Sequence, residues 1–213
     1  MLGSGQATLP GIDVSHYQGA IDWSSVARSG IKFVSMKATE GLDYIDPSFS
    51  LNWKQSKAVG LKRAAYHFAH PSLSPSGQAK FFVDAVENAG GFRDNSTMQF
   101  MLDLEDADKL PPAQVWAWVQ AFMQAVQTLT GRPGIVYTGY YFWRDQVGNP
   151  TDNLNAPLWV AAYIPKPLIP SAWANWTFWQ YADNGAVPGI KGHVDMDLFN
   201  GSVEELDKLC FSS

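Results

Sequence analysis

The sequence is poor in cysteine and in charge: Cys210 is its single cysteine, and charged residues make up 16% of the 213. One cysteine excludes an intrachain disulfide and a zinc site built from cysteines, and we expect Cys210 to be a semi-buried residue of the tail. Lys and Arg number 15 against 20 Asp and Glu, a net charge of -5. Because phosphate binding depends on clustered Lys and Arg, we expect no nucleic-acid partner.

Long apolar runs are also absent. No segment approaches the ~18 apolar residues that a membrane-spanning helix needs, so we expect no membrane segment. The first ten residues lack the basic and apolar parts of a signal peptide. We interpret residues 1–9 as a flexible lead-in and residues 10–213 as one domain, because 46% apolar residues suit a sizeable core and neither a repeat nor a linker marks a second unit. We expect a monomer.

What the chain does have is a series of short apolar segments rich in β-forming residues. Eight are candidate strands: Gly11–Val14, Ile31–Lys37, Leu61–Phe68, Gln99–Glu105, Gly134–Thr138, Leu158–Ala162, Thr177–Tyr181 and Val194–Phe199. Helical spacing separates the earlier ones, most clearly in Pro111–Thr130 and after Ser74, whereas prolines leave little room for long helices after Thr138. This alternation predicts the α/β class, a parallel sheet closed into a small β/α barrel with several outer helices lost.

The most informative segment runs from Met98 to Glu105, where an apolar run leads directly into Asp103-Leu104-Glu105. Side chains two apart on a strand point to one face, so Asp103 and Glu105 project together with Cα atoms about 6.6 Å apart. Neighbouring buried carboxylates drive their pKa values apart, which is what an acid and its partner need in glycoside hydrolysis.

Active sites of β/α barrels lie where the strands end, so the polar residues at these positions are candidates. We expect Asp13, Asp103, Glu105 and Asp195 to converge there in an acidic pocket, with Asp103 and Glu105 as the candidate acid and its partner. Substrate contacts are expected from polar or aromatic residues beside the strand ends, where flat rings stack on sugars: Glu40, Tyr66, His67, Tyr137, Trp159, Tyr163, Trp179 and Gln180.

Metal catalysis is an alternative, because Asp13 with His16 and His67 with His70 place imidazole and carboxylate near adjacent strand ends. Residues three apart on an extended segment face opposite ways, and neither pair lies in an HExxH helix. We therefore expect no metal and no other cofactor, and interpret His16 as a hydrogen-bonding structural residue.

Five motifs occur in order along about Pro10 to Asn200: Gly-Ile-Asp-Val-Ser-His-Tyr-Gln-Gly from Gly11, Lys-Ala-Thr-Glu-Gly from Lys37, Ala-Tyr-His-Phe from Ala65, Asp-Leu-Glu from Asp103, and Val-Asp-Met-Asp-Leu-Phe from Val194. Together with Trp-Gln-Tyr from Trp179 they resemble glycoside hydrolase family 25, the Chalaropsis-type lysozymes. The resemblance implies an irregular TIM-like (β/α)5(β)3 barrel of a single domain. It also implies cleavage of peptidoglycan between N-acetylmuramic acid and N-acetylglucosamine, with retention of configuration.

By position in these motifs, Glu105 resembles the general acid and Asp103 its partner, while Asp13 and Asp195 match the other two acids. Asp197 stands where the family commonly has Asn. From this spacing we expect an added negative charge that raises the pKa values of its neighbours and shifts the pH optimum downward.

The sequence therefore predicts a lysozyme whose partner is bacterial cell-wall peptidoglycan, acting outside the cell or on the wall. Two alternatives remain open at this point. One is a glycan-binding barrel without turnover. The other is a metal-dependent polysaccharide deacetylase that uses Asp13, His16, His67 or His70.

Overall fold

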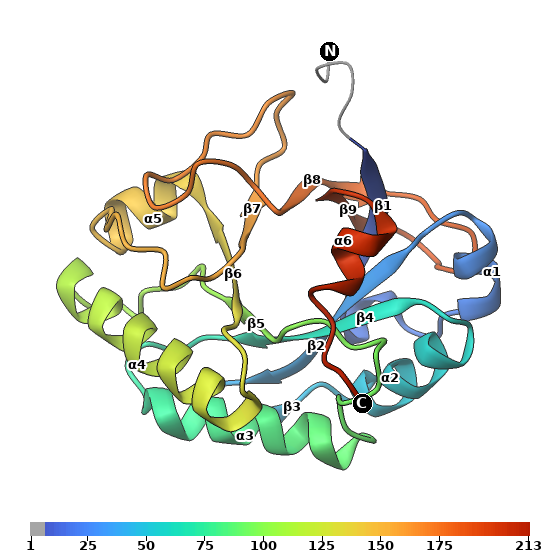
Figure 1. The fold of residues 1–213 in the computed structure, drawn as a ribbon, viewed down its shortest axis with the longest axis horizontal. Helices are drawn as coiled ribbons and strands as arrows, with labels where there is room; N and C mark the ends of the chain where they lie inside the picture. Colours follow the sequence, from blue (N-terminus) through green and yellow to red (C-terminus); the bar gives the residue numbers. More distant parts are fainter. Residues whose placement is uncertain (1–6) are drawn as a thin grey trace.

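Residues 7–213 are described by a computed structural model, in which eight strands close into a barrel (Figure 1). These eight are β1 (Thr8–Val14), β2 (Phe33–Glu40), β4 (Lys62–Phe68), β5 (Met101–Asp103), β6 (Ile135–Gly139), β7 (Leu158–Ala161), β8 (Phe178–Gly185) and β9 (Val194–Asn200). A short additional strand, β3 (Tyr44–Ile45), lies outside the ring. The helices are α1 (Trp23–Arg28), α2 (Phe49–Ala58), α3 (Pro75–Asn88), α4 (Pro112–Thr130), α5 (Tyr140–Gln146) and α6 (Val203–Asp207), and η1 (His16–Gln18) is a 3-10 turn.

The barrel strands follow the order β1-β9-β8-β7-β6-β5-β4-β2, and pairing of β1 with β2 closes the ring. Helices α1 to α5 follow the first five barrel strands, whereas β7, β8 and β9 follow one another without helices between them. This confirms the predicted (β/α)5(β)3 arrangement. The short β3, which pairs antiparallel with the end of β2, was not expected from the sequence.

One strand of the barrel departs from the parallel sheet that the alternation predicted. Strand β9 pairs antiparallel with both β8 and β1, because the chain returns directly from β8 through the 186–193 loop. The first residues of β9 therefore lie at the end of the barrel where the parallel strands finish. That end is the mouth of the barrel.

Two apolar layers hold the fold together. Side chains that alternate inward along the strands fill the barrel, and α6 closes its base. This inner layer contains Phe33, Met101, Ile135, Trp159, Phe178, Phe199, Leu206 and Cys210. The outer layer lies between the strands and α1 to α5 and is larger. Cys210 is buried, deeper than the semi-buried position expected from the sequence.

The ends of the helices are set by local chemistry. The Ser74 hydroxyl accepts a hydrogen bond from the Gly77 backbone N–H, and Pro75 occupies the first turn of α3. Helix α4 ends at Gly131, which has φ +82°, a left-handed conformation that glycine adopts without cost. These helices pack side by side against the barrel (Figure 1).

The N-terminal boundary differs slightly from the predicted one. Strand β1 begins at Thr8, because Thr8 and Leu9 pair with Asn200 and Phe199 of β9. Residues 1–6, the greater part of the predicted lead-in, lie outside the described residues. From residue 7 onward, no helix is long and apolar enough to cross a membrane.

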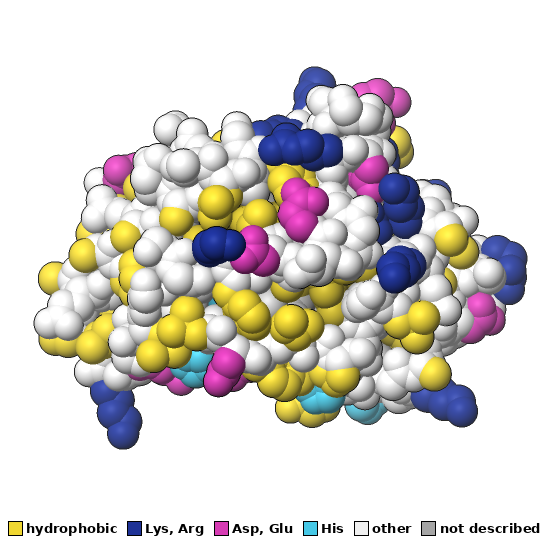
Figure 2. Space-filling view, turned by 90° about the horizontal axis from the view of Figure 1, so that it is seen from below, with side chains coloured by type: hydrophobic (Ala, Val, Ile, Leu, Met, Phe, Trp, Pro, Cys, Tyr) yellow, Lys and Arg dark blue, Asp and Glu magenta, His cyan; other side chains and the backbone are white. Residues whose placement is uncertain are grey.

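Charges of both signs are spread over the face shown in Figure 2. Lys and Arg side chains lie there among Asp, Glu and uncharged atoms.

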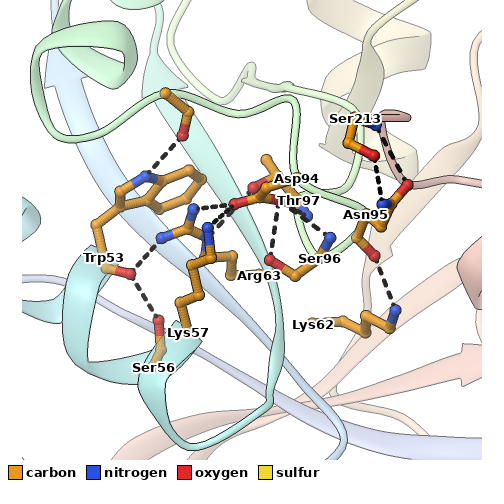
Figure 3. A network of polar contacts seen from close by, with 11 residues as sticks. Trp53, Ser56, Lys57, Lys62, Arg63, Asp94, Asn95, Ser96, Thr97 and Ser213 are labelled. Carbon is orange, nitrogen blue, oxygen red and sulfur yellow. Dashed lines mark hydrogen bonds and ion pairs between the residues drawn. The ribbon is translucent and has the colours of Figure 1, made fainter.

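A buried ionic cluster lies at the opposite end of the barrel from the mouth, where Arg63 at the start of β4 donates to Asp94 at 2.6 Å (Figure 3). The Arg63 guanidinium also lies 3.9 Å from the ring centroid of Trp53. This cluster fixes α2 and the 91–97 loop to the barrel.

Candidate active site

Four carboxyl groups meet at the mouth of the barrel. Asp13 lies near the end of β1, Asp103 ends β5, and Glu105 follows it by two residues. Asp195 is the second residue of β9 and reaches the mouth because that strand runs antiparallel to its neighbours. All four line one cavity: Asp13, Asp103, Glu105 and Asp195.

The cavity has a floor of barrel side chains and opens into a wider groove. Its volume is about 110 Å³, and the adjoining groove, which shares all four acids, adds about 300 Å³. Aromatic and amide side chains complete the floor and walls: Tyr66, Tyr137, Trp159 and Gln180. The groove is extended by residues that were not among the predicted site residues: Ser15, Tyr17, Gln18, Lys37 and Phe68.

Gln180 connects three strands in the floor. Its Oε1 accepts hydrogen bonds from the hydroxyls of Tyr137 and Tyr163, both at 2.8 Å. Its Nε2 donates to Oδ2 of Asp13 at 2.7 Å. Because both tyrosines occupy the carbonyl side, the amide N–H must face Asp13, and the carboxyl group of Asp13 is held in one orientation.

Burial raises the pKa values of the acids on the β1 and β9 side of the cavity. Burial, together with the charge of Asp195, raises the pKa of Asp13 to about 8. Burial also raises the pKa of Asp195. Closely placed carboxyls bind and release protons as a unit, so the Asp13 and Asp195 pair keeps a proton to higher pH than isolated carboxyls do.

Asp103 and Glu105 form a second pair. Burial first, and then the charge of Glu105, raise the pKa of Asp103 well above its usual range. Burial also raises the pKa of Glu105, although the charge of Lys37 opposes it. Asp103 is almost enclosed, whereas Glu105 is exposed to the groove. The pair can therefore hold a proton at a pH where isolated carboxyls are ionised, and Glu105 is its member nearest to a ligand.

Lys37 is the cation of this acidic groove. Its Nζ donates to Oε2 of Glu40 at 2.6 Å and lies 5.0 Å from the ring centroid of Phe68. Glu40 is thus held beside the groove by Lys37 and, at 3.2 Å, by His70. The period-two alternation of β2, which turns Phe33 inward, could have identified Lys37 as a site residue.

Two predicted substrate contacts are wrong. His67 is fully buried outside the barrel, where Thr39 and Gln78 contact its two ring nitrogens at 2.8 and 2.9 Å. Trp179 packs on the outer surface of β8 and donates its indole N–H to the backbone oxygen of Ala162. Each follows or precedes an inward-facing residue directly, and adjacent residues on a strand point to opposite faces.

The histidines do not converge on the acids. His16 Nδ1 contacts Oδ2 of Asp46 at 2.7 Å, in keeping with the predicted hydrogen-bonding role, and His70 lies between Glu40 and Asp108. In the described part of the chain, no three His, Cys, Asp or Glu side chains are grouped as metal ligands. The donor set that the deacetylase alternative requires is not assembled among these residues.

An α/β barrel with four carboxyls and aromatic walls at its mouth is the arrangement expected of a glycoside hydrolase. The sequence also matches the profile of Glycosyl hydrolases family 25 over residues 12–190. The chain belongs to this family.

Relatives and solved structures agree with this assignment. Lysozyme M1 of Streptomyces globisporus is 39% identical over 208 residues, which cover 93% of this chain and 70% of that protein. The N,O-diacetylmuramidase of Chalaropsis sp is 34% identical over 215 residues, 95% of this chain and 99% of that protein. The crystal structure of a bacterial lysozyme from Streptomyces coelicolor superposes with a TM-score of 0.89 at 38% identity, covering 96% and 97% of the two chains.

Proposed function

We propose that this chain is a lysozyme of the N-acetylmuramidase type, which hydrolyses the β-1,4 bond between N-acetylmuramic acid and N-acetylglucosamine in bacterial peptidoglycan. The observation that carries the proposal is the meeting of Glu105, Asp103, Asp13 and Asp195 in one cavity. The names of the similar proteins, a lysozyme and a diacetylmuramidase, support the same substrate. We assign the activity to the single barrel domain, residues 10–213 as predicted, with Thr8 and Leu9 added.

In the first step Glu105 donates its proton to the glycosidic oxygen as the bond to the anomeric carbon breaks. Its raised pKa and its position facing the groove support this role. Asp103 is the enclosed partner with which Glu105 shares the proton. After Glu105 has transferred the proton, the carboxylate of Asp103 faces the positive charge that develops on the sugar.

On the other side of the cavity, Asp13 and Asp195 keep a negative charge beside the reacting sugar. That charge stabilises an oxocarbenium ion, or an oxazolinium ion if the 2-acetamido group of the substrate attacks the anomeric carbon. Water then enters on the face that the leaving sugar has vacated, and Glu105 takes up its proton. This order of steps retains the configuration of the sugar.

The walls of the groove supply the contacts that position the polysaccharide. Tyr66, Tyr137 and Trp159 present ring surfaces to the cavity. Tyr163, which is 53% exposed, joins them through Gln180, and Glu40 acts through Lys37. We propose that the protein works as a monomer on cell walls outside the cell, without a nucleic-acid partner.

Substitution of the acid tests the proposal directly. Glu105→Gln should lower the rate of wall lysis by at least about 100-fold, because general acid catalysis contributes on the order of 10²- to 10⁴-fold. Glu87→Gln, on the exposed surface of α3, is the matched control. Mass analysis of fragments from purified peptidoglycan should find N-acetylmuramic acid at the new reducing ends. Lysis by Glu105→Gln at the wild-type rate would show that Glu105 is not the acid. Binding without released fragments would favour the noncatalytic alternative.

A further inference from the structure

Asp197 is a buried carboxyl group that the proposed reaction does not use. It faces the barrel interior from β9, two residues after Asp195, and its backbone is paired with Gln180 of β8 and Gly11 of β1. Its side chain is fully buried. The indole N–H of Trp159 donates to Oδ1 at 2.9 Å, whereas Oδ2 has no hydrogen-bond partner among the residues described.

The groups around this carboxyl offer it no positive charge. Asp13 approaches from β1 and Asp195 from β9, and both are acids. The third titratable neighbour, Tyr181 on β8, also cannot carry a positive charge. Gln180 on β8 is neutral and directs its N–H to Asp13, and Trp159 on β7 supplies the single donor. None of the ion pairs formed by residues 7–213 includes Asp197. An ionised carboxylate without a cation or a second donor is costly in such a place.

We propose that Asp197 is a positioning residue that keeps its proton at working pH and donates it, from Oδ2, in a hydrogen bond to the carboxyl group of Asp13. One proton resolves both features of the site, because it gives the unpartnered Oδ2 a partner and removes a charge from beside two other acids. Asp13 is then held from two directions, by the amide of Gln180 and by the acid of Asp197.

Two observations indicate that Asp197 donates and Asp13 accepts: the exposure of each acid to the cavity, and the hydrogen-bond donors that each acid already has. Asp13 borders the cavity and accepts from Gln180, and Asp195 is also open to the cavity. The negative charge therefore stays on the Asp13 and Asp195 pair, next to the substrate, and the proton stays on the enclosed Asp197. Burial, and after it the charge of Asp13, raise the pKa of Asp197 well above its usual range, which agrees with this distribution.

The inference rests on the proposed function, since it concerns how Asp13 is prepared for the reaction. It also opposes the expectation drawn from the sequence, that Asp197 adds a negative charge and moves the pH optimum downward. The expected direction was wrong as well, because an added negative charge raises the pKa values of its neighbours and moves the optimum upward. A neutral Asp197 adds no charge, so the optimum is set by the other acids.

Two substitutions of Asp197 distinguish the loss of its hydrogen-bond donor from the loss of a negative charge. Asp197→Asn keeps an acceptor for Trp159 and an N–H donor for Asp13, and it changes no charge if the acid is neutral. We expect it to retain most of the wild-type lytic rate and to leave both limbs of the pH–rate profile in place. A shift of both limbs to lower pH would show that Asp197 is ionised in the wild type and would overturn the proposal.

Asp197→Leu is also neutral but lacks the donor. We expect kcat to fall about tenfold or more, the scale of a lost hydrogen bond to a charged group, and the limb set by the Asp13 and Asp195 pair to move to higher pH. Equal behaviour of the Leu and Asn variants would show that the donor is not needed. Asp152→Asn, at an exposed acid in the loop between α5 and β7, controls for a general effect of removing a carboxyl.

Infrared spectroscopy gives a readout that needs no turnover. In the Glu105→Gln background, at neutral pH, adding Asp197→Asn should remove the carbonyl stretch of one neutral carboxylic acid from the difference spectrum. Because this background is inactive by design, the result bears on the proton of Asp197 even if the proposed lysozyme activity is wrong, or if the Leu variant fails to fold. An unchanged spectrum in that region would refute the proposal.

Discussion

The amide of Gln180 joins two sides of the active site: it donates to Asp13 at 2.7 Å while its carbonyl oxygen accepts from Tyr137 and Tyr163. An amide that donates on one side and accepts on the other cannot rotate by 180° without losing several hydrogen bonds at once. The orientation of Asp13 therefore depends on a residue of a different strand, and on the two hydroxyls that fix that residue.

Gln180→Leu should consequently lower kcat/KM by about tenfold or more, because it removes a hydrogen bond to a carboxylate and leaves two hydroxyls without their acceptor. Gln180 helps to lower the pKa of Asp13, so its loss should raise that pKa and move the corresponding limb of the pH–rate profile to higher pH. Rates measured across pH on cell-wall suspensions check both effects. Gln114→Leu, on the exposed face of α4, should match the wild type.

Lys37 sets the pH range in which Glu105 keeps its proton. Its charge opposes the rise in the pKa of Glu105 that burial causes. Lys37→Met should therefore raise the pKa of Glu105 and move the alkaline limb of the pH–rate profile to higher pH, since the general acid must be protonated. The exposed residue Lys54 on α2 provides the control variant, Lys54→Met. An alkaline limb that stays in place or moves to lower pH would contradict this role.

The cluster at the base of the barrel should contribute to stability and not to catalysis (Figure 3). Asp94 accepts from Arg63 at 2.6 Å and pairs with Lys57 at 2.8 Å. Asp94→Asn leaves the buried Arg63 without its counter-charge, and we expect the free energy of unfolding at pH 7 to fall by about 3 to 5 kcal/mol. Denaturant titration measures it. Asp84→Asn, in an exposed pair with Lys80, should change the free energy of unfolding by less than about 1 kcal/mol.

The same cluster predicts a dependence of stability on pH. Burial opposes ionisation of Asp94, but hydrogen bonds from Lys57 and Ser96 and the charge of Arg63 outweigh it and lower the pKa of Asp94. A group whose pKa is lower in the folded protein stabilises it fully above the unfolded pKa, about 3.9 for Asp, and loses that contribution as the pH falls further. The difference in the free energy of unfolding between wild type and Asp94→Asn should thus become smaller below about pH 4. A difference that stays constant down to pH 2 would contradict this role of Asp94.

Much of the fold could be predicted because its signals are local. Apolar segments bounded by turns gave eight strands within a few residues of their observed ends, and the 3.6-residue spacing gave α3 and α4. The prolines after Thr138 correctly indicated that the last strands lack long helices. The short β3 was missed because two exposed residues, Tyr44 and Ile45, carry no periodic pattern.

Site residues were predicted correctly where the alternation of side chains along a strand was used. They were missed, or wrongly assigned, where it was not. Asp103 and Glu105 line the same cavity, although β5 ends at Asp103 and Glu105 lies two residues beyond it. His67 and Trp179 are adjacent to inward-facing residues and so point outward. The same alternation, applied to β2, would have placed Lys37 in the groove.

By itself the sequence determined the barrel, its strands and the acids that it carries, since periodicity and turn residues are written along the chain. Only the tertiary structure decided which way β9 runs and which groups surround each acid. Asp195 reaches the mouth because β9 is antiparallel, and Asp197 lies beneath Asp13 with a single donor for the same reason. The charge of a carboxyl depends on its burial and its neighbours, and these neighbours come from strands distant in the chain.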